Sequence, residues 1–173
     1  MAIALYDIIV LGSQQTVGAM EGVLQKGLDF CREQGRDPDE LLDARIHPDM
    51  LPFRFQMHSV IKHSVDAIEC AKAGFFGRPP DTPPYDYAQL QAAIASASAQ
   101  LKTYTADEIN ALQGRELVFQ PGGSKMLFNT EDFLLTFSLP NLHFHATTAY
   151  DILRGQGAPV GKRDYLGRMR VKA

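Results

Sequence analysis

The feature that most constrains the fold of this chain is a helical periodicity in its apolar residues, which recurs in four long segments. In each segment the apolar side chains return to one face when successive residues are turned by about 100°, as in an α-helix. The four stripes predict helices over about residues 6–34, 52–73, 86–104 and 130–154. Because each stripe must be buried against other elements, the pattern predicts an all-α fold, a four-helix bundle.

The period changes shortly before the last of these segments. Over about residues 115–128, two short apolar runs flank the turn sequence Pro121-Gly122-Gly123-Ser124. This arrangement predicts a β-hairpin inserted before the last helix. An isolated hairpin is only marginally stable in water, so we expect it to pack on the bundle.

Two segments are expected to lack regular structure. Gly74, Gly77 and four prolines between positions 79 and 84 predict a stiff, extended connection after the second helix. This connection does not separate domains, because its two sides have matching apolar faces, and we expect one domain over residues 1–173. The end of the chain is basic and is expected to form a solvated tail, with its charges at Lys162, Arg163, Arg168, Arg170 and Lys172.

Composition excludes several classes of protein. The net charge is −3, which gives no reason to expect binding to nucleic acid or to an anionic membrane. No apolar stretch is long enough to cross a bilayer, and the N-terminus has no features of a secretion signal, so a cytoplasmic location is expected. The two cysteines, Cys31 and Cys70, lie within helical patterns and are expected to be small buried hydrophobic residues.

The most informative polar residues lie in the last predicted helix. Asn141 and His145 project within about 20° of Leu134 and Ile152, in the middle of the apolar stripe. Burying such groups costs about 1 to 3 kcal/mol each unless they find partners, so they are expected to form a satisfied polar network or to line a small pocket. Pro140 is expected to distort the helix beside them.

Three other histidines have different expected positions. His143 points away from the apolar stripe of its helix. His58 and His63 lie on opposite sides of the stripe of the second helix and are expected at its boundary, with only one of them reaching the interior near His145. His145 with one of these two would supply two nitrogen ligands to a metal, and a third would have to be Asn141, water or a carboxylate. A hydrogen-bonded core histidine is the alternative interpretation.

Several segments are distinctive as a set: Leu41-Leu42-Asp43-Ala44-Arg45, Pro48-Asp49-Met50, Leu139-Pro140-Asn141 through His145, Thr147-Thr148-Ala149-Tyr150-Asp151-Ile152-Leu153-Arg154, and Gly161-Lys162-Arg163-Asp164-Tyr165-Leu166-Gly167. With them the chain resembles, over almost its whole length, an uncharacterised bacterial family within the DinB/YfiT-like superfamily of four-helix bundles. The resemblance implies a DinB-like bundle, often a homodimer. The wider superfamily includes metal-dependent hydrolases and thiol S-transferases.

The resemblance also implies where a metal would bind. The usual site in that superfamily takes one histidine from the second helix and two, four residues apart, from the last, and here the latter positions are Asn141 and His145. An amide is a poor ligand for zinc or nickel, so the chain departs from the pattern at Asn141. Two hypotheses follow: a non-catalytic or small-ligand-binding bundle, or a divergent metal-dependent hydrolase or thiol S-transferase-like enzyme with His145 and His58 or His63 as ligands. A third hypothesis is a purely structural homodimer, in which the exposed side that carries His143 and Phe144 packs on a second copy.

Overall fold

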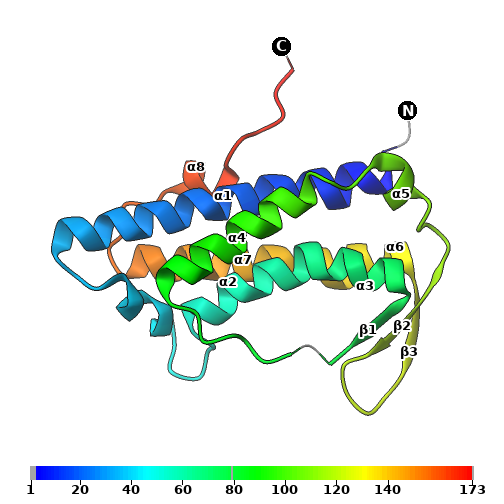
Figure 1. The fold of residues 1–173 in the computed structure, drawn as a ribbon, viewed down its shortest axis with the longest axis horizontal. Helices are drawn as coiled ribbons and strands as arrows, with labels where there is room; N and C mark the ends of the chain where they lie inside the picture. Colours follow the sequence, from blue (N-terminus) through cyan, green and yellow to red (C-terminus); the bar gives the residue numbers. More distant parts are fainter. Residues whose placement is uncertain (1–2, 79, 173) are drawn as a thin grey trace.

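Four helical runs pack side by side in the computed structural model, which describes residues 3–78 and 80–172 (Figure 1). The first run is α1, and the third is α4. The second and fourth runs each consist of two α-helices joined by a π-helical turn. In chain order the four runs are α1 (Leu5–Gln34); α2 (Phe53–Ile61), η2 (Lys62–Asp66) and α3 (Ala67–Ala73); α4 (Tyr87–Leu101); and α6 (Thr130–Phe133), η3 (Leu134–Ser138) and α7 (Leu139–Gly155). The predicted four-helix bundle is confirmed.

Shorter helical pieces lie between the runs and after the last of them, and capping side chains mark several helix ends. At the start of α4, the side chain of Asp86 accepts a hydrogen bond from the backbone of Gln89, whose side chain accepts one from the backbone of Asp86. Thr105 likewise caps the short helix before the hairpin by accepting from Glu108. The short elements are the 3₁₀-helix η1 (Pro38–Asp43), α5 (Ala106–Asn110) and α8 (Lys162–Leu166).

A small sheet lies at one end of the bundle, beside α3 and α6 (Figure 1). The predicted hairpin is present as β2 (Glu116–Gln120) and β3 (Met126–Asn129). A third strand, β1 (Phe75–Gly77), pairs in parallel with β2, so the prediction of an irregular connection was wrong for these residues. Three residues are too few to carry a periodic signal, and their extended form depends on the partner strand, to which the carbonyl of Gly74 also bonds.

Aromatic rings attach the sheet to the bundle, as the marginal stability of a hairpin requires. Phe76 of β1 and Phe119 of β2 stack with ring centroids 5.3 Å apart. The ring of Phe119 also lies 4.9 Å from that of Phe137, on the fourth helical run. Phe133, which is fully buried, lies among these rings. The sheet is therefore part of the hydrophobic core.

The prediction of a solvated tail from Lys162 was wrong for its first residues, which form α8 against α1. The side chain of Gln15 donates to the carbonyl of Leu166 at 2.8 Å, and Lys26 pairs with Asp164 at 2.8 Å. Gly167 follows with φ of 58°, and an added Cβ there would lie 2.9 Å from Cβ of Ala19. Close packing on α1 fixes this segment, and its charges remain at the surface.

The expectation that both cysteines are buried is met by Cys31 and only in part by Cys70. Cys31 and Cys70 are both free thiols, the first buried and the second half-buried. Over residues 3–78 and 80–172, every helix is too short or too polar to span a bilayer. The cytoplasmic location stays a prediction.

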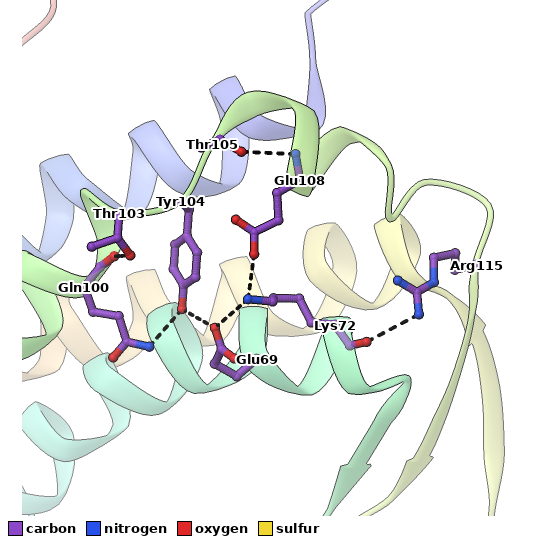
Figure 2. Close-up of polar contacts among 8 residues, drawn as sticks. All are labelled: Glu69, Lys72, Gln100, Thr103, Tyr104, Thr105, Glu108 and Arg115. Atoms are coloured by element: carbon purple, nitrogen blue, oxygen red, sulfur yellow. Dashed lines mark hydrogen bonds and ion pairs between the residues drawn. The ribbon is translucent and has the colours of Figure 1, made fainter.

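A polar network braces α3 against the α4 to α5 connection (Figure 2). The hydroxyl of Tyr104 donates to Glu69 at 2.7 Å and accepts from the side chain of Gln100 at 3.1 Å. Lys72 bridges Glu69 and Glu108, at 3.4 and 2.6 Å. Burial, followed by the bond to Glu69, raises the pKa of Tyr104, so its hydroxyl is a permanent donor at neutral pH.

We expect the buried part of this network to contribute more stability than its exposed part. Tyr104→Phe removes a hydrogen bond to a carboxylate from a side chain that is only 5% exposed, and should cost about 1 to 2 kcal/mol of unfolding free energy. Glu108→Gln removes a solvent-exposed ion pair and should cost less than about 1 kcal/mol. Urea unfolding of both variants measures the difference, and an equal or reversed order would contradict this account.

Candidate functional site

Both helical runs that carry the predicted site residues contain a π turn, and the two π turns are bonded to each other. The hydroxyl of Ser138, at the end of η3, donates to the backbone carbonyl of His63 in η2 at 2.9 Å. A π turn accommodates an extra residue, which changes the direction of the side chains around it, and such turns are frequent at functional sites. The site is built where these two turns meet.

This arrangement brings His63 and His145 together. Their ring centroids are 5.6 Å apart, and the ring planes are nearly parallel, at 11°. Phe137 packs edge-on against His63, and Phe55 packs edge-on against His145. The predicted meeting of His145 with a second-helix histidine therefore takes place through His63, in an aromatic setting.

The orientation of His145 is set by Gln56, a residue that the sequence analysis missed. Nδ1 of His145 lies 2.7 Å from Oε1 of Gln56, and Nε2 of Gln56 donates to the carbonyl of Leu51 at 2.8 Å. Since the amide donates to a carbonyl on one side, its oxygen faces the ring, and Nδ1 must be the protonated nitrogen. Nε2 of His145 is left with its lone pair. The sequence signal that could have found Gln56 was its own position, as a polar residue within the apolar pattern of the second helix.

A lysine with a largely buried side chain, Lys62, directly precedes His63 in the π turn η2. Lys62 is 8% exposed as a residue, and its ammonium does not stand among the buried, unpartnered atoms of the described residues. Its charge lowers the pKa of His58, His63 and His145. Burial lowers the pKa of Lys62 itself, and the negative charge of Asp66, one turn along, opposes that effect. The site is therefore electropositive.

Both site histidines are neutral at pH 7. Burial is the main cause and lowers the pKa of His63 to about 3 and that of His145 to about 4. The positive charge of Lys62 acts in the same direction. Each neutral ring offers one hydrogen-bond donor and one acceptor.

His58 occupies a neighbouring position and does not join the pair. It is 7% exposed, its ring lies 5.9 Å from that of Tyr85, and neither of its nitrogens has a partner among the described residues. The expectation of boundary positions was wrong for both second-helix histidines. His58 is covered by the chain that leads into α4, and His63 lies within the π turn, where the regular helical wheel does not hold.

The predictions for the other residues on the helix of His145 have different outcomes. Asn141 is half-buried, and its amide donates to the carbonyl of Phe137 at 2.7 Å rather than to His145. Pro140 is the second residue of α7, which follows directly after η3, so the predicted helix distortion takes the form of a π turn. His143 is exposed, as predicted. Phe144 beside it is 57% exposed, and the homodimer through this side stays a prediction.

The donors at this site do not fit a metal centre of the usual three-ligand kind. In residues 3–78 and 80–172, no three side chains of histidine, cysteine, aspartate or glutamate gather in a way that could hold a metal ion. The two imidazoles are accompanied by an amide that is engaged with the backbone and by a lysine whose charge repels cations. Nε2 of His145 has the free lone pair and the oriented ring that a metal ligand requires.

A separate cavity of about 630 Å³ lies between α1, α4 and residues 168–171 of the C-terminal segment. It has no histidine in its lining, and most of its lining side chains are exposed or half-buried. The buried, unpartnered polar atoms of the described residues belong to Arg54, His58 and His63, and none of these three residues lines this cavity.

Comparisons with known proteins agree with the fold. A family model described as "Domain of unknown function (DUF1993)" matches residues 5–166. A crystal structure of a DinB family member protein from Shewanella denitrificans is 27% identical to this chain, with a TM-score of 0.80 over 98% of this chain and 95% of that one. No curated protein matches the sequence significantly.

Proposed function

Since the chain belongs to the DUF1993 family, whose function is unknown, we propose a function from its own residues. In this proposal the DinB-like bundle is non-catalytic and binds a small ligand. The proposed binding site is the cluster formed by Gln56, Lys62, His63 and His145, which we call the histidine–lysine cluster. Asn141 lies at its edge, one turn before His145.

The observation that carries this proposal is the set of buried polar atoms without partners. Nδ1 of His63 and both ring nitrogens of His58 lie out of contact with solvent and bond to no described residue. Leaving a buried donor or acceptor unpaired costs about 1 to 3 kcal/mol, and native proteins rarely do so. A bound small molecule would supply the missing partners for His63.

The alternative function is that of a divergent metal-dependent hydrolase or thiol S-transferase-like enzyme. It is supported by the orientation of His145, whose Nδ1–H is held by Gln56 as in metal-binding imidazoles. In this reading His63 would be the second-helix ligand, and zinc or nickel would supply Lewis acidity. The absence of a third strong donor among the described residues, and the charge of Lys62, argue against it.

Metal content separates the two functions. We expect protein that is purified without an affinity tag or added metal to contain far less than one equivalent of zinc, nickel or iron by elemental analysis. His145→Ala should leave that content unchanged, as should the matched control His143→Ala, which removes an exposed histidine two residues away. Stoichiometric metal that disappears in His145→Ala but persists in His143→Ala would overturn the metal-free reading.

A further inference from the structure

We propose that the free edge of the small sheet is a docking surface for a second copy of this chain. In the proposed dimer, β3 (Met126–Asn129) pairs in antiparallel fashion with β3 of the second copy, so that the two sheets become one. This surface differs from the histidine–lysine cluster, and the proposal holds whether or not a ligand binds there. It also differs from the side of α7 that carries His143 and Phe144.

The first observation is that β3 lies at the edge of the sheet. The strand order is β1-β2-β3, so among the described residues β3 pairs on one side only. The hairpin that contains it extends away from the four helical runs at one end of the bundle (Figure 1). An unpaired strand edge presents backbone N–H and C=O groups that can bond to a strand of another chain.

The hydrogen bonds between β2 and β3 show which backbone groups face outward. The N–H of Thr130 donates to the carbonyl of Arg115 at 2.8 Å, which marks a hydrogen-bonded pair just beyond the two strands. Bonded and non-bonded pairs alternate along an antiparallel ladder, so Leu127 and its opposite residue Val118 form a non-bonded pair. Val118 accordingly turns its N–H toward β1 and donates to Gly74 at 2.9 Å. The N–H and C=O of Leu127 therefore point out from the sheet.

The second observation is that this edge carries exposed apolar side chains and none of the usual obstacles to pairing. Leu127 is 58% exposed and Met126 is 47% exposed. Edge strands of natural proteins are commonly protected by a charged residue, a proline or a bulge. Between Met126 and Asn129, β3 contains no charged residue and no proline, and its register with β2 is regular. The edge is therefore open to a further strand.

The third observation is that the edge is complementary to itself, which identifies the occupant as a second copy. In an antiparallel pair centred on Leu127, this side chain lies opposite Leu127 of the second copy. The same register places Met126 opposite Phe128 of the second copy on the other face of the joined sheet. Exposed apolar residues thus meet apolar residues along the whole strand.

The charges at the two ends of β3 are complementary in the same register. Lys125, which directly precedes the strand, lies opposite Asn129 of the second copy. The side-chain amide of Asn129 donates to the carboxylate of Asp132 at 3.1 Å, and this carboxylate is exposed. Each lysine therefore faces an aspartate of the other copy, and the two-fold axis repeats the contact at both ends.

The strand has only four residues, so the interface is small and we expect a reversible dimer with a dissociation constant of about 10 to 100 µM. Analytical ultracentrifugation of the full chain between about 1 and 500 µM should show the change from monomer to dimer. Amide hydrogen exchange then locates the contact. The N–H of Leu127 should exchange more slowly as the dimer forms, whereas that of Phe128, which lies in a bonded pair with β2, should not change.

A monomer throughout this concentration range would overturn the proposal. A dimer in which exchange at Leu127 is unchanged would overturn it as well. The matched variants are Leu127→Lys and Phe144→Lys, which replace exposed apolar side chains on two different surfaces. The first places two like charges at the two-fold axis and should weaken association at least about 10-fold, while the second should leave it unchanged. The reverse result would place the dimer on the Phe144 side.

Charge reversal tests the antiparallel register. Lys125→Glu and Asp132→Lys each bring like charges together at both ends of the dimer, so each variant alone should associate about 3- to 10-fold more weakly than the original chain. In an equimolar mixture, both ends of the mixed dimer again carry opposite charges, and association should recover. Weakened variants that do not recover on mixing would overturn the pairing centred on Leu127. The exchange measurement needs no variant, so the proposal is tested even if a substitution disturbs folding.

Discussion

Lowering the pH from 7 to 5 should destabilise this protein by about 2 kcal/mol through His63 alone. Burial, together with the nearby His145 and Lys62, lowers the pKa of His63 to about 3 in the folded chain, against an ordinary value of 6.5. Between these values the unfolded chain binds a proton that the folded chain does not. The stabilising contribution is therefore complete above about pH 6.5 and is lost progressively as the pH falls toward 3.

His145 acts in the same direction. Its pKa is lowered to about 4, by burial and then by the charge of Lys62, so it too remains neutral in the folded chain at pH 5. Because its side chain is partly exposed, we expect it to add less than His63. The total loss between pH 7 and 5 should lie between about 2 and 4 kcal/mol.

Urea unfolding at pH 7, 6 and 5 measures this dependence, and two variants assign it. His63→Phe should flatten the curve, since it removes the proton that the unfolded chain binds. His145→Phe is the second variant, and it should flatten the curve less than His63→Phe, because the His145 side chain is partly exposed. A wild-type stability that stays constant over this range would mean that His63 becomes protonated in the folded chain, and the burial argument would fail.

The bundle could be predicted from sequence because long amphipathic stripes leave few other ways to bury their apolar faces. The π turns could not. The extra residue of a π turn leaves the helix continuous, and η2 contains no glycine or proline that would mark the turn in the sequence. A regular helical wheel therefore placed His63 at the boundary of its helix. In the structure the His63 ring stacks on that of His145 instead. The π turn rotates His63 away from its place on a regular helix, and the hydrogen bond from Ser138 to the His63 carbonyl joins the two π turns.

The other differences have one physical cause, namely that short elements take their structure from their partners. The strand Phe75–Gly77 exists because β2 offers a ladder, and the helix Lys162–Leu166 exists because α1 offers Gln15 and Lys26. Local composition at both places favours irregular or solvated chain. The position of His145 on its stripe was predictable, whereas Gln56, which fixes its tautomer, came from a contact 89 residues away in sequence.

Replacing Phe133 with alanine should cost about 3 to 5 kcal/mol of unfolding free energy, the largest loss that we expect from a single substitution in this chain. The side chain is fully buried, and its ring lies 5.2 Å from that of Phe76 and 5.5 Å from that of Phe137. Truncation leaves a cavity where the sheet joins the fourth helical run. The rings around it belong to separate elements, so they cannot collapse into the gap without moving the sheet.

The matched control is Phe144→Ala, which removes the same side chain from an exposed position on the same helical run and should change stability by less than about 0.5 kcal/mol. Urea unfolding gives both values, and hydrogen exchange locates the damage. Because Phe133 directly precedes η3, Phe133→Ala should speed exchange of the backbone amides in β1 and in η3 more than in α1. A loss below about 1 kcal/mol would mean that the sheet is not part of the cooperative core. A large loss that leaves β1 protected would place the damage in the bundle alone, and the packing of the sheet against the π turn would need revision.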